Sequence, residues 1–530
     1  MGTLTGTGIL ARHILRRDRL ILPLWGFLSA VYPMSIANST VALYPTADLL
    51  RPVAQEAMAN PAQLATRGVV FDAGAGGMTA WTVGSSGAML MGLVSMLLVI
   101  RHTRVDEESG RSELIGSGVV GRQAPPAAAL GVVCSVNLLI GALMSVLLMG
   151  TGLPAAGSLA LGLALAAAGC TFAAVGAVAA QVTESAVSAR GLGVSVFIAF
   201  FLIRAVGDAS GAHWLSWLSP LGWTLNVRPF AGERWWVAAL LLAFIALLAV
   251  AAHMLSARRD LAAGLLPPRL GPAAAAPGLR SPLALAWRLH RGQVVAWTAG
   301  FAVAGLTLGG AVSGNLEGQL NSPQIMDMIA RVGGEDARPA DFFLNFLLSM
   351  LAWIVATSGM LSALRLRSEE SAGRADLVLV TPVSRVRWAL SHLVVALAGP
   401  ALVLAALGVT AGLGYSLTSG DIGKLPQVLA GALAYLPAVW VMTGIAAALA
   451  GLLPRFAMAA WGIWVGFILI DVFGMLGQVN ANLLEIIPFV HIPWVLLGQM
   501  SPAPLAVLTA VAAALTAAGV AGLRRRDLVA

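Results

Sequence analysis

The sequence predicts an all-α polytopic membrane protein, and three observations lead to that class. Hydrophobic residues make up 58% of the 530 residues and charged residues only 11%, which is more apolar surface than one water-soluble core would bury. Apolar runs, each long enough to cross roughly 30 Å of hydrocarbon as a helix, recur about twelve times. A densely charged segment at 101–122 recurs in the second half of the chain. We therefore expect about twelve transmembrane helices, arranged as two parallel six-helix repeats.

The apolar runs divide evenly between the two halves of the chain. They lie near 20–40, 80–100, 127–150, 156–181, 191–208 and 235–254, and then near 294–313, 342–364, 389–412, 426–451, 457–476 and 502–522. An even number of crossings gives both halves the same orientation in the membrane. The expected division is a first transmembrane half at 1–261, a Pro- and Ala-rich cytoplasmic linker at 262–280 and a second transmembrane half at 281–530.

The distribution of basic residues predicts that both termini are cytoplasmic. If the N-terminus is inside, 24 of the 32 Lys and Arg residues fall in inside segments, seven fall outside and Arg204 lies within a span. Positive residues concentrate on the cytoplasmic side of membrane proteins. Contact with inner-leaflet lipids explains the net charge of +8, so no nucleic-acid partner is required. The single lysine, Lys424, amid abundant Ala, Gly and Arg indicates a GC-rich bacterial genome, and we expect a bacterial plasma-membrane location.

The charged segment between the second and third apolar runs of each half repeats closely. The first copy reads Glu107-Glu108-Ser109-Gly110-Arg111-Ser112-Glu113-Leu114, and the second reads Glu369-Glu370-Ser371, an inserted Ala372, and Gly373-Arg374-Ala375-Asp376-Leu377. From the glycine onward the two copies keep an offset of 263 residues. Arg258-Arg259-Asp260-Leu261 recurs as Arg525-Arg526-Asp527-Leu528 at an offset of 267. We expect the charges of both copies to lie at a cytoplasmic surface, where they steer and register a protein partner.

No catalytic, metal-binding or cofactor-binding pattern is recognisable in the sequence. The seven His and two Cys residues are scattered and lack the spacing of metal ligands. Gly423-Lys424 resembles the end of a phosphate-binding loop, but Thr418 and Leu425 replace the Gly and the Ser or Thr that the motif requires. We therefore expect a transport subunit that is not an enzyme and holds no cofactor. Any ATP and Mg²⁺ would be bound by another polypeptide.

The doubled Glu-Glu-Ser-Gly-Arg segment, Thr381-Pro382-Val383-Ser384-Arg385 and the Arg-Arg-Asp-Leu segments resemble the permease of bacterial ABC exporters of polyketide antibiotics such as tetronasin. The resemblance covers nearly the whole chain. It implies the type-2 ABC exporter permease fold, in which the segment after the second span of each half forms a coupling helix that docks on an ATPase. It also implies efflux of large apolar molecules, either polyketide-type antibiotics or multiple drugs, driven by a cytoplasmic ABC ATPase in two copies. The coupling residues that it implies are Glu107, Glu108, Gly110, Arg111, Glu113, Glu369, Glu370, Gly373, Arg374 and Asp376.

An ion-gradient-driven twelve-helix secondary transporter is the alternative. Such carriers also have two six-span halves, and many have an acidic loop containing Gly-Arg after the second span. The intramembrane carboxylates that a proton relay needs are scarce here. Asp471 lies clearly within a span, whereas Glu184 and Asp208 lie near span ends. A gene for a Walker-type ATPase beside this one would favour the ABC exporter.

Arg204 and Asp471 carry opposite charges in corresponding spans and align at an offset of 267. A lone charge within a bilayer costs a few kcal/mol or more, so each side chain requires a partner or a wet cavity. The resemblance implies that these two spans lie near the junction of the halves, so we expect the two side chains to meet, or to face one cavity, there. The alternative is a local pair between Arg204 and Asp208, which lie four residues apart on one helical face.

Overall fold

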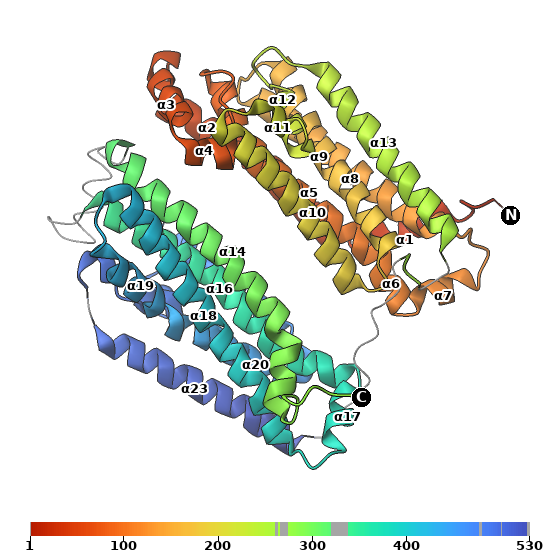
Figure 1. Cartoon of the computed structure of the whole chain (residues 1–530), viewed down its shortest axis with the longest axis vertical. Helices are drawn as coiled ribbons and strands as arrows, with labels where there is room; N and C mark the ends of the chain where they lie inside the picture. The colour runs from red at the N-terminus through yellow and green to blue at the C-terminus, as the bar shows by residue number, and fades with distance from the viewer. Residues whose placement is uncertain are drawn as a thin grey trace. The chain divides into compact units, whose positions relative to one another are not determined.

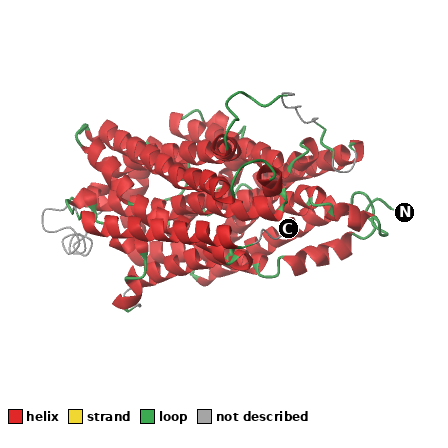
Figure 2. Ribbon diagram, turned by 90° about the horizontal axis from the view of Figure 1, so that it is seen from below, coloured by secondary structure: helices red, strands yellow, loops and turns green. Residues whose placement is uncertain are grey.

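The computed structural model describes residues 2–259, 263–265, 274–319, 338–475, 480–499 and 501–526, and every regular element within these ranges is a helix (Figures 1 and 2). The chain forms two compact units, Met1–Gly271 and Pro272–Ala530. The described residues include 11 helical spans that are long and apolar enough to cross a membrane. The chain is therefore a polytopic α-helical membrane protein. Residues 262 and 266–273 of the expected linker, and the Asp and Leu of both Arg-Arg-Asp-Leu segments, lie outside the described residues.

The first unit contains six of these spans. They are α2 (Ile21–Leu43), α5 (Ala75–His102) with its continuation α6 (Arg104–Glu108), α8 (Ala124–Gly150), α9 (Ala155–Val182), α10 (Ala186–Ser210) and α13 (Trp235–Arg258). Rich in Ala and Gly and buried along most of its length, α9 lies at the centre of the unit. The shorter helices are α1 (Thr7–Arg17), α3 (Ala47–Ala59), α4 (Pro61–Arg67), α7 (Arg111–Gly116), α11 (His213–Ser216) and α12 (Pro220–Asn226).

The second unit contains the other five spans. They are α14 (Pro282–Gln319), α16 (Pro339–Ser371), α18 (Arg385–Ser419), α19 (Lys424–Ala434) continued by α20 (Leu436–Leu452), and α23 (Pro502–Arg525). The apolar run expected near 457–476 forms α21 (Ala459–Met475), which at 17 residues is shorter than the other spans. An arrangement of twelve spans in two repeats therefore stays a prediction. The shorter elements are α17 (Arg374–Leu379), α22 (Ala481–Leu484) and the 3₁₀ turns η1 (Pro454–Phe456), η2 (Pro488–His491) and η3 (Val495–Leu497).

The last span of the second unit packs closely on α20 because small residues line their contact. A Cβ atom placed on Gly451 would overlap the backbone of Gly519, and one placed on Gly519 would overlap the backbone of Ala447. Lipid tails are as apolar as most side chains, so helices in a membrane associate through such close packing rather than through burial of apolar surface. This contact holds the C-terminal end of α23 beside the C-terminal end of α20.

Candidate functional site

The repeated charged segments form one cluster at an end of each unit. In the first unit, α6 and α7 lie at the same end as the C-terminus of α13, and in the second unit α17 lies at the same end as the C-terminus of α23 (Figure 1). Each cluster therefore gathers the end of the second span, the start of the third and the end of the last. This is the end that the distribution of basic residues in the sequence predicts to be cytoplasmic.

A buried arginine and a glutamate join these helix ends in the first unit. Arg259, the residue directly after α13, donates from Nη2 to Oε1 of Glu107 at 2.5 Å and from Nη1 to Oε2 at 2.9 Å. Its Nε donates to Oε1 of Gln181 on α9 at 2.6 Å. Arg104, which is fully buried, donates to Oε2 of Glu107 at 2.5 Å. The planar guanidinium matches the carboxylate with two parallel hydrogen bonds, so the geometry is specific to arginine.

The second unit contains the same arrangement. Arg526, directly after α23, donates from Nη1 and Nη2 to the two carboxylate oxygens of Glu370 at 2.5 and 2.6 Å. Its Nε donates to the carbonyl oxygen of Gly451 on α20 at 3.0 Å. Arg367 lies 3.4 Å from the same carboxylate. We call the pairs Glu107–Arg259 and Glu370–Arg526 the two clasps.

Equivalent residues make a further equivalent contact at each clasp. Arg122 donates to the carbonyl oxygen of Arg259, and Arg385 donates to that of Arg526 at 2.8 Å. These two donors are 263 residues apart, the same offset that separates Glu107 from Glu370. Each clasp therefore ties the start of the third span to the ends of the second and the last.

This equivalence corrects the register in which the two charged segments align. The sequence alignment paired Glu107 with Glu369 by inserting Ala372, whereas the contacts pair Glu107 with Glu370 and require no insertion. The shared Glu-Glu-Ser letters are misleading because position on the helix, not the tripeptide, decides which carboxylate faces the arginine of the last span. In the corrected register Glu108 has no acidic counterpart. It accepts a hydrogen bond from the Ala186 amide at 2.6 Å and so binds the N-terminal end of α10.

A second carboxylate in each cluster binds the arginine that opens the short helix. Asp106 accepts from Arg111 at 3.2 Å, and Glu369 accepts from Nε of Arg374 at 2.7 Å. Hydrogen bonding to Glu369 raises the pKa of the Arg374 guanidinium above its ordinary value, because the bond favours the charged form. Asp106 also binds Arg17 of α1 at 2.9 Å.

Glycine is required at the turn into each short helix. Gly110 has φ 71° and Gly373 has φ 67°, a left-handed conformation that costs other residues free energy because their Cβ meets the backbone. The turn redirects the chain from the second span into α7 or α17, each six residues long. Both short helices therefore leave the membrane-spanning helices at the same place in their units.

The exposed face of each short helix carries an acid followed by a leucine. Glu113 and Leu114 lie on α7, and Asp376 and Leu377 occupy the equivalent positions on α17. The leucines are 77% and 76% exposed. A charge can orient a protein partner and an uncovered leucine can supply apolar contact, so these two faces stay the predicted partner-binding surfaces.

Apart from the two turn glycines, the ten residues implied as coupling residues separate into two groups. Three of the six carboxylates expected to be the partner-binding charges are internal, and of these Glu369 and Glu370 are 6% and 4% exposed. Glu107 is half-buried within its clasp. The exposed members are Glu108, Arg111, Glu113, Arg374 and Asp376.

The sequence analysis missed the arginines that bind the clasp carboxylates. These are Arg104 and Arg259 in the first unit, and Arg367 and Arg526 in the second. The repeated Arg-Arg-Asp-Leu segments were the available signal, since the second arginine of each is the clasp residue. Their distance in the sequence from the glutamates concealed the connection.

The two intramembrane charges each have a partner within their own unit. Arg204 lies 3.3 Å from Asp208 and donates to the carbonyl oxygen of Ala65 in α4 at 2.7 Å. Asp471 accepts from the indole Nε1 of Trp353 at 3.1 Å. The local pair between Arg204 and Asp208, the alternative expected from the sequence, is thus present. The pairing of Arg204 with Asp471 stays a prediction.

Comparison with known proteins places these units in a transporter family. Residues 279–524 match the family model of the C-terminal domain of the multidrug efflux system permease Rv1217c. The chain is 43% identical over 526 residues to the multidrug efflux system permease protein Rv1217c of Mycobacterium tuberculosis, and the match covers 99% of this chain and 95% of the relative. With its membrane-spanning helices and near full-length similarity, the chain belongs to the family of multidrug efflux system permeases.

Proposed function

We propose that this chain is the membrane-spanning subunit of an ATP-driven efflux pump, energised by two copies of a separate cytoplasmic ABC ATPase. The observation that carries the proposal is the duplication of one short exposed helix, α7 in the first unit and α17 in the second, each anchored by a clasp and each presenting an acid and a leucine. One ATPase subunit docks on each helix. The partner binds the ATP and Mg²⁺, and this chain supplies the path across the membrane.

The clasps give such docking a mechanical consequence. A force on α7 is transmitted to the second span through Glu107 and to the last span through Arg259, because two hydrogen bonds join these side chains. The same holds for α17 through Glu370 and Arg526. Nucleotide-driven closure of the ATPase then shifts several spans together, provided that the inward-open and outward-open states bind the ATPase with different affinity.

The proposed substrates are large apolar molecules, either polyketide-type antibiotics or several unrelated drugs. The name of the Mycobacterium tuberculosis relative describes multidrug efflux. The spans themselves are lined mainly by Ala, Gly, Leu and Val, which offer apolar contact without fixed polar specificity. In this proposal the chain lies in the bacterial plasma membrane with both termini in the cytoplasm.

A secondary transporter driven by an ion gradient is the second candidate, and Asp471 is the observation that favours it. This carboxylate lies in α21 and has one hydrogen-bond donor among the described residues, Trp353. An intramembrane acid with so few partners resembles a proton-binding group. We favour the ABC proposal because both short helices leave an acid and a leucine uncovered at equivalent positions, where one ATPase subunit can dock on each.

Reconstitution with a candidate ATPase separates the two functions. The chain is copurified with a candidate ABC ATPase, inserted into liposomes and supplied with an apolar drug. The ABC proposal expects two ATPase subunits per chain, ATP hydrolysis stimulated by the drug, and drug movement that stops without ATP. Drug transport by the chain alone under an imposed proton gradient, without ATP or ATPase, contradicts it and supports the secondary transporter.

A further inference from the structure

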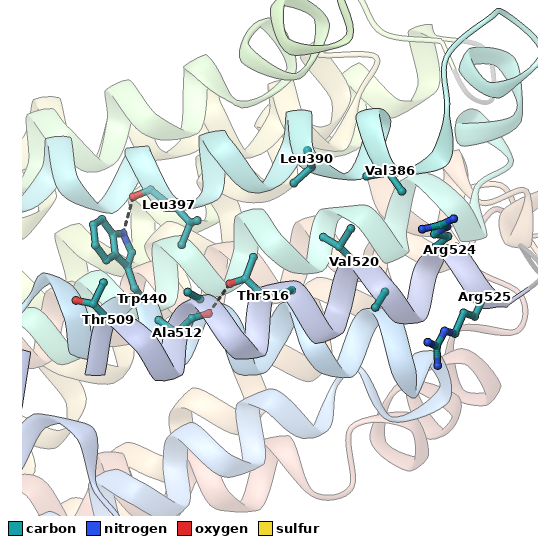
Figure 3. A pocket seen from close by; sticks show the side chains of 13 residues that line it. Val386, Leu390, Leu397, Trp440, Thr509, Ala512, Thr516, Val520, Arg524 and Arg525 are labelled. Carbon is teal, nitrogen blue, oxygen red and sulfur yellow. Dashed lines mark hydrogen bonds between the residues drawn. The ribbon is translucent and has the colours of Figure 1, made fainter. Parts of the chain in front are cut away.

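The second unit carries a long apolar groove of about 990 Å³ between α18, α20 and α23 (Figure 3). Leu390, Leu397 and Val520 line its middle, together with small side chains of α23. Trp440 closes one end, and its indole Nε1 donates to the carbonyl oxygen of Leu397 at 2.9 Å. The opposite end of the groove is strongly basic.

Two arginines form that basic end. Arg524 and Arg525 both line the groove and are both exposed. Within the described part of the chain neither has an ion-pair partner, whereas the next residue, Arg526, is bound to Glu370 in the clasp. The two guanidinium groups therefore offer several hydrogen-bond donors to an anion that comes from outside the protein.

The length of the groove matches one leaflet of a bilayer. From Thr509 to Arg525, residues that line its two ends, an α-helix rises roughly 24 Å at 1.5 Å per residue. Half of a bilayer's hydrocarbon is roughly 15 Å thick, and the headgroup layer adds about 5 to 7 Å. A rounded drug molecule would not extend along this length, but a lipid with its headgroup at the arginines would.

The groove also opens toward the surroundings of α23. Only 17% of the most apolar stretch of this helix is buried within the described structure. Ala513, Ala517 and Ala521 lie on its exposed surface and line the groove. A molecule in the surrounding bilayer can therefore enter the groove sideways, without passing through the interior of the unit.

We propose that this groove binds one anionic phospholipid from the leaflet that surrounds the C-terminal end of α23. Arg524 and Arg525 bind the headgroup phosphate, since arginine pairs with phosphate through two parallel hydrogen bonds. An acyl chain lies along Leu390, Leu397 and Val520 and ends at Trp440. This site goes beyond the proposed efflux function and does not depend on which energy source drives it.

The bound lipid would fasten α23 to α18 beside the second clasp. The basic end of the groove directly precedes Arg526, so a lipid there would contact α23 and α18 next to the arginine that the clasp binds to α16. Anything that binds only the folded protein stabilises it by mass action. Thermal stability should therefore depend on anionic lipid and not on lipid in general.

Lipid titration of the purified full-length chain tests the site. The chain is stripped of lipid in a neutral detergent and titrated with phosphatidylglycerol or with phosphatidylcholine of the same acyl chains, while native mass spectrometry counts bound lipids. One phosphatidylglycerol per chain should bind tightly and raise the melting temperature, and phosphatidylcholine should do neither. Arg524→Gln with Arg525→Gln should weaken that binding by at least about tenfold.

Two further variants make the result specific. Ala517→Trp fills the groove and keeps both arginines, and it should also abolish the tight binding. Arg12→Gln with Arg16→Gln removes the same charge from exposed positions on α1 and should leave the binding unchanged. Equal binding of the two lipids, equal loss in the α1 control, equal stabilisation by inorganic phosphate, or displacement of phosphatidylglycerol by an apolar drug would each overturn the proposal.

Discussion

Arg526 closes the second unit by donating two hydrogen bonds, at 2.5 and 2.6 Å, to the carboxylate of Glu370, a residue 156 positions earlier in the chain. Glu370 is 4% exposed, so its charge is removed from water and depends on this partner. Arg259 and Glu107 repeat the relationship in the first unit across 152 positions. The last span of each unit is thereby fixed to the segment that we expect to bind the ATPase.

Breaking the second clasp should destabilise its unit. Arg526→Ala leaves the Glu370 carboxylate buried with weaker compensation, and removing one partner of a buried pair costs about 3–5 kcal/mol. Thermal unfolding of the purified chain in detergent should show the loss. Replacing both residues with Gln should be milder because no charge is left uncompensated. Exposed Asp376→Asn provides the control, and a control as unstable as Arg526→Ala would contradict a specific role for the clasp.

The exposed leucines should matter for docking and not for folding. Leu114→Ser and Leu377→Ser should each weaken association with the ATPase by about tenfold or more, since fully burying a leucine side chain contributes roughly 1.5–3 kcal/mol. Melting temperatures should stay unchanged because both side chains are uncovered. Association is measured by copurification and by binding kinetics on the immobilised complex.

An exposed leucine elsewhere controls for a general loss of apolar surface. Leu417 is 79% exposed and lies at the other end of α18 from α17. Leu417→Ser should leave ATPase association unaltered. If it weakens association as much as Leu377→Ser, α17 is not the docking element.

The turn glycines should tolerate no side chain. Gly373→Ala forces a Cβ into a left-handed conformation and should cost roughly 1–2 kcal/mol, with reduced ATPase coupling because α17 is displaced. Gly116→Ala, in an open position without positive φ, should be neutral. Drug-stimulated ATP hydrolysis and the melting temperature are measured for both. Equal effects of the two substitutions would show that the φ at Gly373 is unimportant.

The purified chain without its partner should neither bind nor hydrolyse ATP. The glycine-rich loop that would cradle the phosphates is missing around Lys424, and Nζ of that lysine binds Asp341 at 2.7 Å. Isothermal titration with ATP and Mg²⁺ should give no saturable heat. Saturable binding together with hydrolysis by the chain alone would place the motor on this polypeptide.

Charge exchange in the membrane distinguishes the two partners proposed for Arg204. The observed contacts predict that Asp208→Asn damages transport, because it leaves Arg204 buried without its counter-charge. Arg204→Asp combined with Asp471→Arg should then give damage that is at least additive. A double variant that transports better than either single variant would instead show that Arg204 and Asp471 act as a pair across the halves.

The sequence alone determined the class of the protein and the location of its helices. Apolar runs near 127–150 and 156–181 became α8 and α9 within a few residues, because the hydrocarbon thickness sets the length of any helix that crosses it. The repeated glycine, Gly110 and Gly373, also coincides with a turn in each unit, since few residues other than glycine adopt positive φ. These properties are local, and a short stretch of sequence carries them.

Tertiary structure decided which charges pair and which remain available to a partner. The letters Glu-Glu-Ser suggested that Glu107 corresponds to Glu369, but the ends of α13 and α23 select Glu107 and Glu370. A carboxylate is stable both in water and in an ion pair with an arginine, so its role depends on which helix ends lie next to it. That meeting is set by the packing of spans more than 150 residues apart in the sequence, and no local pattern encodes it.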